Sequence, residues 1–480
     1  MRVLDHGRIA VYGDVMTTLS LPATGSAPVR PDQLSPDQVH DVLRRHLLVD
    51  GFDMVLDLSA SRGSTLVDAR DGTCYLDLFT FFASNALGMN HPGLTEDPLF
   101  REELLTAALN KPSNSDVYSV PMARFVEVFA RVLGDPGLPH LFFVEGGALA
   151  VENALKVAFD WKSRWNQAHG RDPRLGTQVL HLKDAFHGRS GYTMSLTNTD
   201  PVKVARFPQF VWPRISSPYL SAGRDVAAAE QVALEQARAA FEAHPHDIAC
   251  FLMEPIQGEG GDHHFRPEFL QAMQALCREF DALLVLDEVQ SGAGLTGTAW
   301  AFQQLGVQPD VVAFGKKTQV CGVMAGGRVD EVPDNVFAVG SRINSTWGGS
   351  LADMVRARRI LEVVEAEGLI ARAGTLGAQL DAMLQQLAAD HPEVTDVRGR
   401  GLMRAFSLPT GPLRDAVLTA LREDEHVLLL GCGTRSVRFR PALTVAVEDL
   451  AAGVAAIDRV LSRLTAHAPA TAGTSTKAAT

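Results

Sequence analysis

Two stretches decide the fold, ALLVLDEVQ (residues 282–290) and DVVAFGKK (residues 310–317). Each begins as an apolar run with the length of a buried strand, and each then gives way to charged residues. Similar runs occur earlier in the chain, at residues 141–144, 177–182 and 248–253. Longer stretches with apolar residues at helical spacing separate them. Strands that alternate with helices predict an α/β domain with a mostly parallel sheet.

The regions outside this alternation predict further parts of the chain. A length of 480 residues is too great for one ordinary core, so we expect more than one domain. Residues 65–80 predict a hairpin, and a helical pattern followed by short strands after residue 350 predicts a smaller α+β domain. We therefore expect four parts: an N-terminal segment (1–69), a large domain (70–350), a small domain (351–465) and a disordered tail (466–480).

Composition narrows the classes of partner. The net charge of −12 argues against nucleic acid or an anionic membrane surface as the main partner. The five cysteines are scattered without a CxxC pair, as is typical of free thiols in a reducing compartment. The N-terminal stretch lacks the layout of a signal peptide, and no run has the length of a membrane span. We expect a cytoplasmic protein.

Asp287 and Lys316 stand where the two deciding strands end. Ligands of parallel sheets bind at the C-terminal strand ends, so we expect these side chains to share a site. A lysine amine and a carboxylate are the groups that pyridoxal phosphate requires. The amine forms a Schiff base, and the carboxylate keeps the pyridine nitrogen protonated. Lys317 is the alternative amine.

Other strand ends add candidates for the same site. Gly147 and Ala148 open a helix directly after a strand, where backbone N–H groups suit a phosphate. Phe186 could stack on a planar ring, and Arg189 offers a fork for a carboxylate, although a surface ion pair explains that arginine equally well. Glu259 lies in a Gly-rich loop after the strand at 248–253.

Two patterns in this region do not indicate sites of their own. Adjacent His263 and His264 lack the spacing of a metal site, so no metal is expected. The run from Gly292 to Gly297 has the form GxGxxG, but the acidic residue that would bind a ribose about 20 residues later is missing. We interpret it as a shaped loop.

Five motifs in this order and spacing resemble the class III pyridoxal-phosphate aminotransferases: MEPIQGEG (253–260), LDEVQSGAGLTG (286–297), DVVAFGK (310–316), STWGG (345–349) and VRFRPAL (437–443). The resemblance covers residues 56–462. It implies the type I aminotransferase fold, with the N-terminal segment joining the small domain, and a homodimer with shared active sites. The variants at 145–156, 185–193, 314–332 and 342–349 resemble the members of the class that act on L-lysine.

The resemblance also implies roles for single residues. Lys316 would form the Schiff base and move the proton, Asp287 would hold the pyridine nitrogen, and Gln290 would bind the phenolic oxygen. Cofactor contacts would further come from Gly147, Ala148, Phe186, Val289 and, from the neighbouring subunit, Thr346.

The implied reaction moves the 6-amino group of L-lysine to 2-oxoglutarate. Arg189 would hold the carboxylate far from the reacting centre, and Arg438 the carboxylate beside it. Glu259 would cover Arg438 while lysine reacts, because a buried unpaired charge is costly. Asn344 is a further candidate for contact with the substrate.

Other functions stay open at this point. The near alternatives are ornithine, acetylornithine or 4-aminobutyrate as the amino donor, and an aminomutase of the same fold. A pyridoxal-phosphate-binding regulator is disfavoured, because the chain shows neither a basic helix-turn-helix stretch nor a positive charge.

Overall fold

The computed structural model describes residues 34–466. The chain divides into two compact units, Met1–Val55 and Leu56–Thr480. In the first unit, η1 (Pro36–Gln38) leads into α1 (Val39–Arg44), and His40 Nδ1 lies 3.3 Å from Asp53 Oδ1. The start of the predicted N-terminal segment (1–33) and the predicted tail beyond Ala466 lie outside the described residues. The four-part division of the chain stays a prediction.

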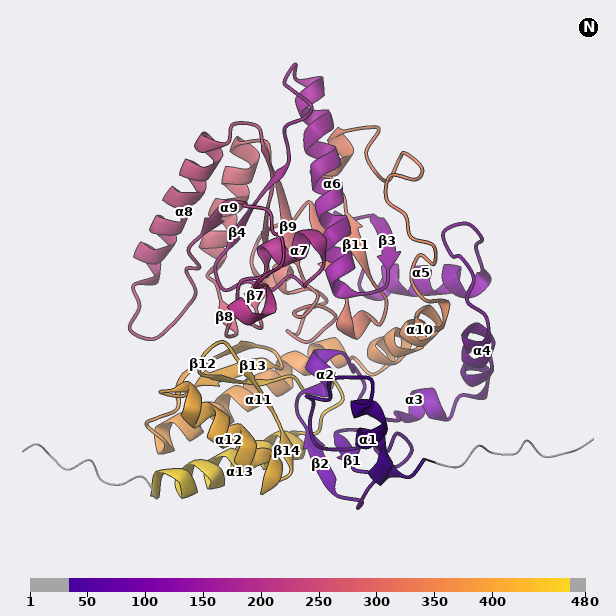
Figure 1. The fold of residues 1–480 in the computed structure, drawn as a ribbon, viewed down its shortest axis with the longest axis vertical. Coiled ribbons are helices and arrows are strands. Elements are labelled where there is room, and N and C mark those ends of the chain that lie inside the picture. Colours follow the sequence, from indigo (N-terminus) through magenta and orange to yellow (C-terminus); the bar gives the residue numbers. More distant parts are fainter. Residues whose placement is uncertain (1–33, 467–480) are drawn as a thin grey trace, which may run out of the picture. The chain divides into compact units, whose positions relative to one another are not determined.

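A seven-stranded sheet organises the second unit (Figure 1). Its order is β3-β11-β10-β9-β6-β4-β5. The strands are β3 (His140–Val144), β4 (Gln178–Leu182), β5 (Arg214–Ile215), β6 (Ile248–Met253), β9 (Leu283–Asp287), β10 (Val311–Phe314) and β11 (Cys321–Ala325). β11 runs antiparallel to both of its neighbours, β3 and β10, and the other neighbouring pairs in this sheet are parallel. The predicted α/β fold with a mostly parallel sheet is confirmed, whereas β5 and β11 were not predicted.

Helices cover both faces of this sheet. Side chains alternate along each strand, so the apolar strands present apolar side chains to both faces, and both must be buried. In β9, Leu283 and Val285 pack in the apolar cluster of α6 (Gly147–Ala168), while Leu284 and Leu286 pack in the cluster of α9 (Pro267–Glu279). On the α9 face the chain adds α4 (Pro98–Leu109), α5 (Val120–Val132), α8 (Val226–Ala243) and α10 (Leu351–Ala366).

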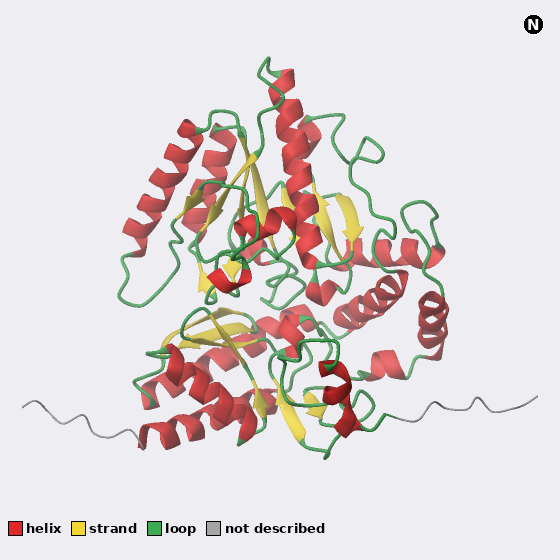
Figure 2. Cartoon of the chain, viewed as in Figure 1, coloured by secondary structure: helices red, strands yellow, loops and turns green. Residues whose placement is uncertain are grey.

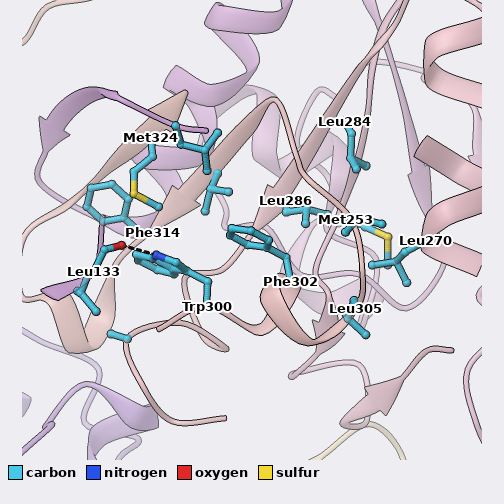
Figure 3. Packing of buried hydrophobic residues seen from close by; sticks show 14 of the residues in the cluster. Leu133, Met253, Leu270, Leu284, Leu286, Trp300, Phe302, Leu305, Phe314 and Met324 are labelled. Atoms are coloured by element: carbon cyan, nitrogen blue, oxygen red, sulfur yellow. Dashed lines mark hydrogen bonds between the residues drawn. The ribbon is translucent and has the colours of Figure 1, made fainter. Parts of the chain in front are cut away.

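Aromatic packing fixes the core beneath the strand ends (Figure 3). The Trp300 indole is fully buried, and its Nε1 donates a hydrogen bond of 2.6 Å to the Leu133 carbonyl. The Phe314 ring lies 6.0 Å from it, centroid to centroid. Removing such a buried indole costs about 3–5 kcal/mol. This packing anchors the end of β10, from which the chain continues to Lys316.

The C-terminal part forms a second sheet with its own core (Figure 2). Its order is β12-β13-β16-β15, with β12 (Thr395–Arg400), β13 (Met403–Ser407), β15 (Leu430–Cys432) and β16 (Ser436–Phe439). Three helices belong to the same core: α11 (Leu369–Asp390), α12 (Gly411–Glu423) and α13 (Val447–Ala466).

Two smaller sheets complete the unit. The predicted hairpin forms β1 (Thr65–Val67) and β2 (Cys74–Asp77), and β2 runs parallel to β14 (Val427–Leu428). The other pairs β7 (Ile256–Gln257) with β8 (His263–His264). Short elements between them are α2 (Thr80–Ala83), α3 (Pro92–Thr95), α7 (Gly191–Leu196), η2 (Pro201–Lys203), η3 (Ala301–Gln304), η4 (Lys316–Thr318) and η5 (Gly327–Glu331). In the described part of the chain no helix is both long and apolar enough to span a bilayer.

Candidate active site

Lys316 and Asp287 follow neighbouring parallel strands. Asp287, the last residue of β9, is in register with Ala313 of β10, and the Glu288 N–H donates to the Ala313 carbonyl at 2.9 Å. Lys316 comes three residues after Ala313 and has a φ of +54°, in the left-handed region. That conformation costs a non-glycine residue about 1–3 kcal/mol and is typical of functional sites.

The Lys316 amine is prepared for nucleophilic attack. Burial and the positive charges of Arg438 and Arg440 together lower the pKa of Lys316 to about 8, although the negative charges of Asp287 and Glu254 oppose this shift. A neutral amine near pH 8 is a far better nucleophile than an ordinary protonated lysine. The neighbouring Lys317 is buried, and its Nζ donates to the Ala83 carbonyl at 2.8 Å.

His187 orients the Asp287 carboxylate. Its Nδ1 lies 2.8 Å from Asp287 Oδ2, and the Val289 N–H donates to Oδ1 at 3.1 Å. Burial opposes a charged imidazole, but the hydrogen bond and charge of Asp287 outweigh it and raise the pKa of His187. The His187 ring therefore fixes the position of the Asp287 carboxylate. We did not predict a role for His187, although it stands next to Phe186 in the same loop.

The start of α6 forms a cradle for an anion. Gly146 precedes the helix with a φ of +98°, and the first helical turn holds no acidic residue. A Cβ on Gly147 would lie 2.9 Å from Val289 Cγ1, and one on Gly188 would lie 2.5 Å from Ala148 Cβ. The helix N-terminus therefore packs closely against the loop after β9, with backbone N–H groups suited to a phosphate.

Two arginines fix the Gln290 side chain. Its Oε1 accepts from Arg438 Nη1 at 3.3 Å and from Arg440 Nε and Nη2 at 3.1 and 3.0 Å. Arg440 is in turn held by the buried Asp262. Because both cations require the oxygen of the amide, its NH₂ group is left to donate to another acceptor. We predicted a role for Arg438 but missed Arg440 and Asp262.

Glu259 bridges two cations. Its Oε2 lies 3.0 Å from Arg438 Nη2, and its Oε1 lies 2.6 Å from Lys203 Nζ. Burial opposes the charged carboxylate, but Arg438 and Lys203 together lower the pKa of Glu259. The buried Arg438 Nε has no hydrogen-bond partner among the described residues. A carboxylate of a ligand would supply one.

Three predicted residues are exposed: Arg189, Asn344 and Thr346. The Thr346 carbonyl accepts from Ser113 Oγ at 2.5 Å, and Asn344 Oδ1 accepts from the Ser345 N–H at 2.7 Å. Within residues 34–466, no hydrogen bond or ion pair joins these three side chains to Lys316 or Asp287. The Arg189 guanidinium is likewise unpaired in this part of the chain.

Phe186 lies in the loop after β4, and this loop is held by the Glu254 carboxylate. Its N–H donates to Glu254 Oε2 at 3.0 Å, and Lys203 Nζ lies 5.5 Å from the centre of its ring. Burial raises the pKa of Glu254 to about 7, and the charge of His187 opposes that rise. This hydrogen bond holds the loop that carries Phe186 and His187.

The arrangement fits pyridoxal phosphate on several independent features. It offers a lysine of lowered pKa, a carboxylate at the end of the neighbouring strand, a helix N-terminus lined by small residues, and an amide whose oxygen is bound by arginines so that its NH₂ group can donate. These are the groups needed for the aldehyde, the pyridine nitrogen, the phosphate and the phenolic oxygen.

Comparison with known proteins places the chain. A family model described as aminotransferase class-III matches residues 49–461. An L-lysine-epsilon aminotransferase of Mycobacterium tuberculosis is 68% identical over 90% of this chain and 97% of that protein. Its counterpart in Streptomyces clavuligerus is 60% identical over 89% and 96%.

A solved structure agrees. The lysine aminotransferase from M. tuberculosis in the internal aldimine form has a TM-score of 0.89 and 68% identity, over 90% of this chain and 100% of that one. This chain and the lysine aminotransferase from M. tuberculosis thus share sequence and fold along nearly their whole length. The chain belongs to the class III aminotransferases.

Proposed function

We propose that this protein transfers the 6-amino group of L-lysine to 2-oxoglutarate, with pyridoxal phosphate as its cofactor. The products are L-glutamate and 2-aminoadipate 6-semialdehyde, whose amine and aldehyde then close to piperideine-6-carboxylate. The observation that carries the proposal is the ion pair between Arg438 and Glu259, in which the same Arg438 acts electrostatically on Lys316. Lysine is the donor named for the relatives of high identity.

Residues of this chain would hold the cofactor from all sides. Asp287 would bind the pyridine nitrogen, and the Gln290 NH₂ group would bind the phenolic oxygen. Phe186 and Val289 would pack on the two faces of the ring. Backbone N–H groups of Gly147 and Ala148 would bind the phosphate.

When bound, pyridoxal phosphate supplies an aldehyde that condenses with amines and a ring that withdraws electrons from the substrate carbon. The chain supplies the base. Once freed by the incoming amine, Lys316 Nζ takes the proton from the carbon that carries the reacting nitrogen. Its lowered pKa of about 8 suits a group that must both accept and return a proton near neutral pH.

The two substrates place their carboxylates differently. In L-lysine the carboxylate is far from the reacting amine, and Arg189 would bind it there. In 2-oxoglutarate a second carboxylate adjoins the reacting carbon and would bind Arg438. Glu259 covers Arg438 in the first case and leaves it in the second. Asn344 would contact the substrate.

A homodimer with shared sites is part of the proposal. Thr346 would bind the cofactor phosphate of the neighbouring subunit. Exposed apolar side chains near the Thr346 segment support this: Leu109, Val117, Tyr118 and Val120 are 64–79% exposed. That segment packs against residues 113–115, next to them in the chain.

The test is the visible spectrum of the purified holoenzyme. L-Lysine should remove the absorbance of the Lys316-bound cofactor, and 2-oxoglutarate should restore it, with glutamate released in the second step. Bleaching by ornithine or 4-aminobutyrate but not by lysine would keep the mechanism and overturn the donor. Failure of 2-oxoglutarate to restore the band would overturn the acceptor.

A further inference from the structure

The Glu259 carboxylate has a cationic partner on each oxygen. Arg438 Nη2 lies 3.0 Å from Oε2, and Lys203 Nζ lies 2.6 Å from Oε1. Arg438 has a role in the reaction proposed above, whereas Lys203 has none. Its ammonium nevertheless makes the shorter of the two ion pairs.

The two cations come from different parts of the fold. Lys203 ends η2, a short turn that starts where the Asp200 side chain accepts from the Val202 N–H at 2.9 Å. Arg438 lies on β16 of the second sheet. Glu259 therefore has one partner in the connection between β4 and β5 of the seven-stranded sheet and another on a strand of the second sheet.

The environments of the two cations differ as well. The Arg438 side chain is 3% exposed, whereas Lys203 and Glu259 are 24% and 28% exposed. Arg438 depends on a carboxylate partner for its charge, because water reaches it poorly. Lys203 stands at the solvent side, above the Phe186 ring, where it can hold a carboxylate that has left the interior.

Space for that movement lies next to the pair. A cavity of about 670 Å³ is lined by Lys203, Glu259, Tyr219 and Arg398, among others, but by neither Arg438 nor Lys316. Glu259 and Lys203 thus share this cavity, whereas Arg438 does not line it. The Glu259 side chain can turn toward it, away from Arg438, without losing Lys203.

We propose that Lys203 is a positioning residue that keeps Glu259 anchored when Arg438 receives the carboxylate of the keto acid. The inference rests on the proposed function. Without Lys203, the released Glu259 carboxylate would have lost both of its cationic partners, so it would compete more strongly with the carboxylate of the keto acid for Arg438. With lysine bound, Glu259 stays on Arg438 whether or not Lys203 is present.

The consequence is a defect in one half-reaction only. Lys203→Met should lower the rate at subsaturating 2-oxoglutarate about tenfold, the effect expected from one charge-assisted hydrogen bond. The half-reaction with L-lysine should stay within about twofold of the wild type, since the donor state keeps its Glu259–Arg438 pair. Lys203→Arg should restore most of the rate with 2-oxoglutarate.

Single-turnover mixing of the holoenzyme measures the two halves separately. The cofactor absorbance is followed after mixing with L-lysine, and again after mixing the aminated enzyme with 2-oxoglutarate. Lys183→Met is the matched control: it removes one positive charge from an exposed side chain on the loop after β4. It should behave as the wild type in both halves.

Repeating the measurement in a Glu259→Gln enzyme shows whether Lys203 acts through Glu259 or on the substrate directly. If Lys203 acts through Glu259, Lys203→Met should have no further effect on the 2-oxoglutarate step in a Glu259→Gln enzyme. An undiminished effect there would overturn the inference and assign Lys203 to the substrate itself. Equal slowing of both halves, or no slowing at all, would also overturn it. A wild type that fails to react with lysine or 2-oxoglutarate would instead overturn the proposed function and the inference together.

Discussion

At the scale of single residues, Lys316 combines an unusual backbone conformation with an unusual acidity. Its φ of +54° turns the side chain out of the line of β10, and burial lowers its pKa to about 8. Below the pKa the amine is protonated and cannot attack an aldehyde, and above it the amine is neutral. The pH dependence of cofactor attachment therefore measures the lowered pKa of the buried Lys316.

We expect the cofactor-free protein to recombine with pyridoxal phosphate about tenfold faster per pH unit up to a pH of about 8, with a plateau above it. Stopped-flow absorbance across this range measures the rate. An ordinary lysine, with a pKa of 10.5, would give a rate that still rises at pH 10. Lys316→Ala is the control, because it removes the covalent linkage altogether.

Some residues of the site were predictable from the sequence and others were not. Lys316 and Asp287 could be paired because each ends an apolar run, and ends of adjacent parallel strands meet. Lys203 and His187 bind partners 56 and 100 residues away, at Glu259 and Asp287. Neither motif nor spacing predicts such contacts, because they depend on how loops from different strands fold over one edge of the sheet.

At the scale of elements, continuous apolar runs predicted five strands well, since most of their residues are buried on both faces. β11 was missed because Gly322 interrupts a run of only five residues directly after the lysine motif. β5 has two residues and depends on its pairing with β4. The local sequence pattern predicts a strand poorly where the strand forms mainly through pairing with a distant part of the chain.

The N-terminus of α6 gives a prediction at this scale. Gly147→Ala places a methyl group 2.9 Å from Val289 Cγ1, so either the Val289 side chain or the start of the helix must shift. We expect the affinity for pyridoxal phosphate to fall about tenfold, because the backbone donors are displaced. Absorbance titration of the cofactor-free protein measures it.

Gly374→Ala provides the comparison for that variant. Gly374 lies within α11, and an added Cβ would come no nearer than 3.8 Å to the Gly297 Cα. Its affinity for the cofactor should equal that of the wild type. Equal affinities in Gly147→Ala and Gly374→Ala would contradict the role given to the start of α6.

At the scale of the whole molecule, the proposed homodimer makes every site depend on two chains. We expect Lys316→Ala and Thr346→Asp subunits to be inactive alone, the first without its amine and the second with a charge that repels phosphate. Mixed dimers should regain activity, because one of their two sites then contains both Lys316 and Thr346. Coexpression with two affinity tags isolates them for assay.

No recovery in the mixed dimers would place Thr346 in the same subunit's site or outside the site. The cytoplasmic location expected from the sequence stays a prediction.

The bond between Glu259 and Arg438 has one further consequence. Because Glu259 follows the seven-stranded sheet and Arg438 belongs to the second sheet, their ion pair also ties together the two halves of the catalytic unit. A keto acid that takes Arg438 replaces that internal tie with itself. The same ion pair then serves both the choice of substrate and the connection between the two sheets. An inhibitor that binds Glu259 and Arg438 together would therefore occupy the active site and also hold the two sheets in one relative position.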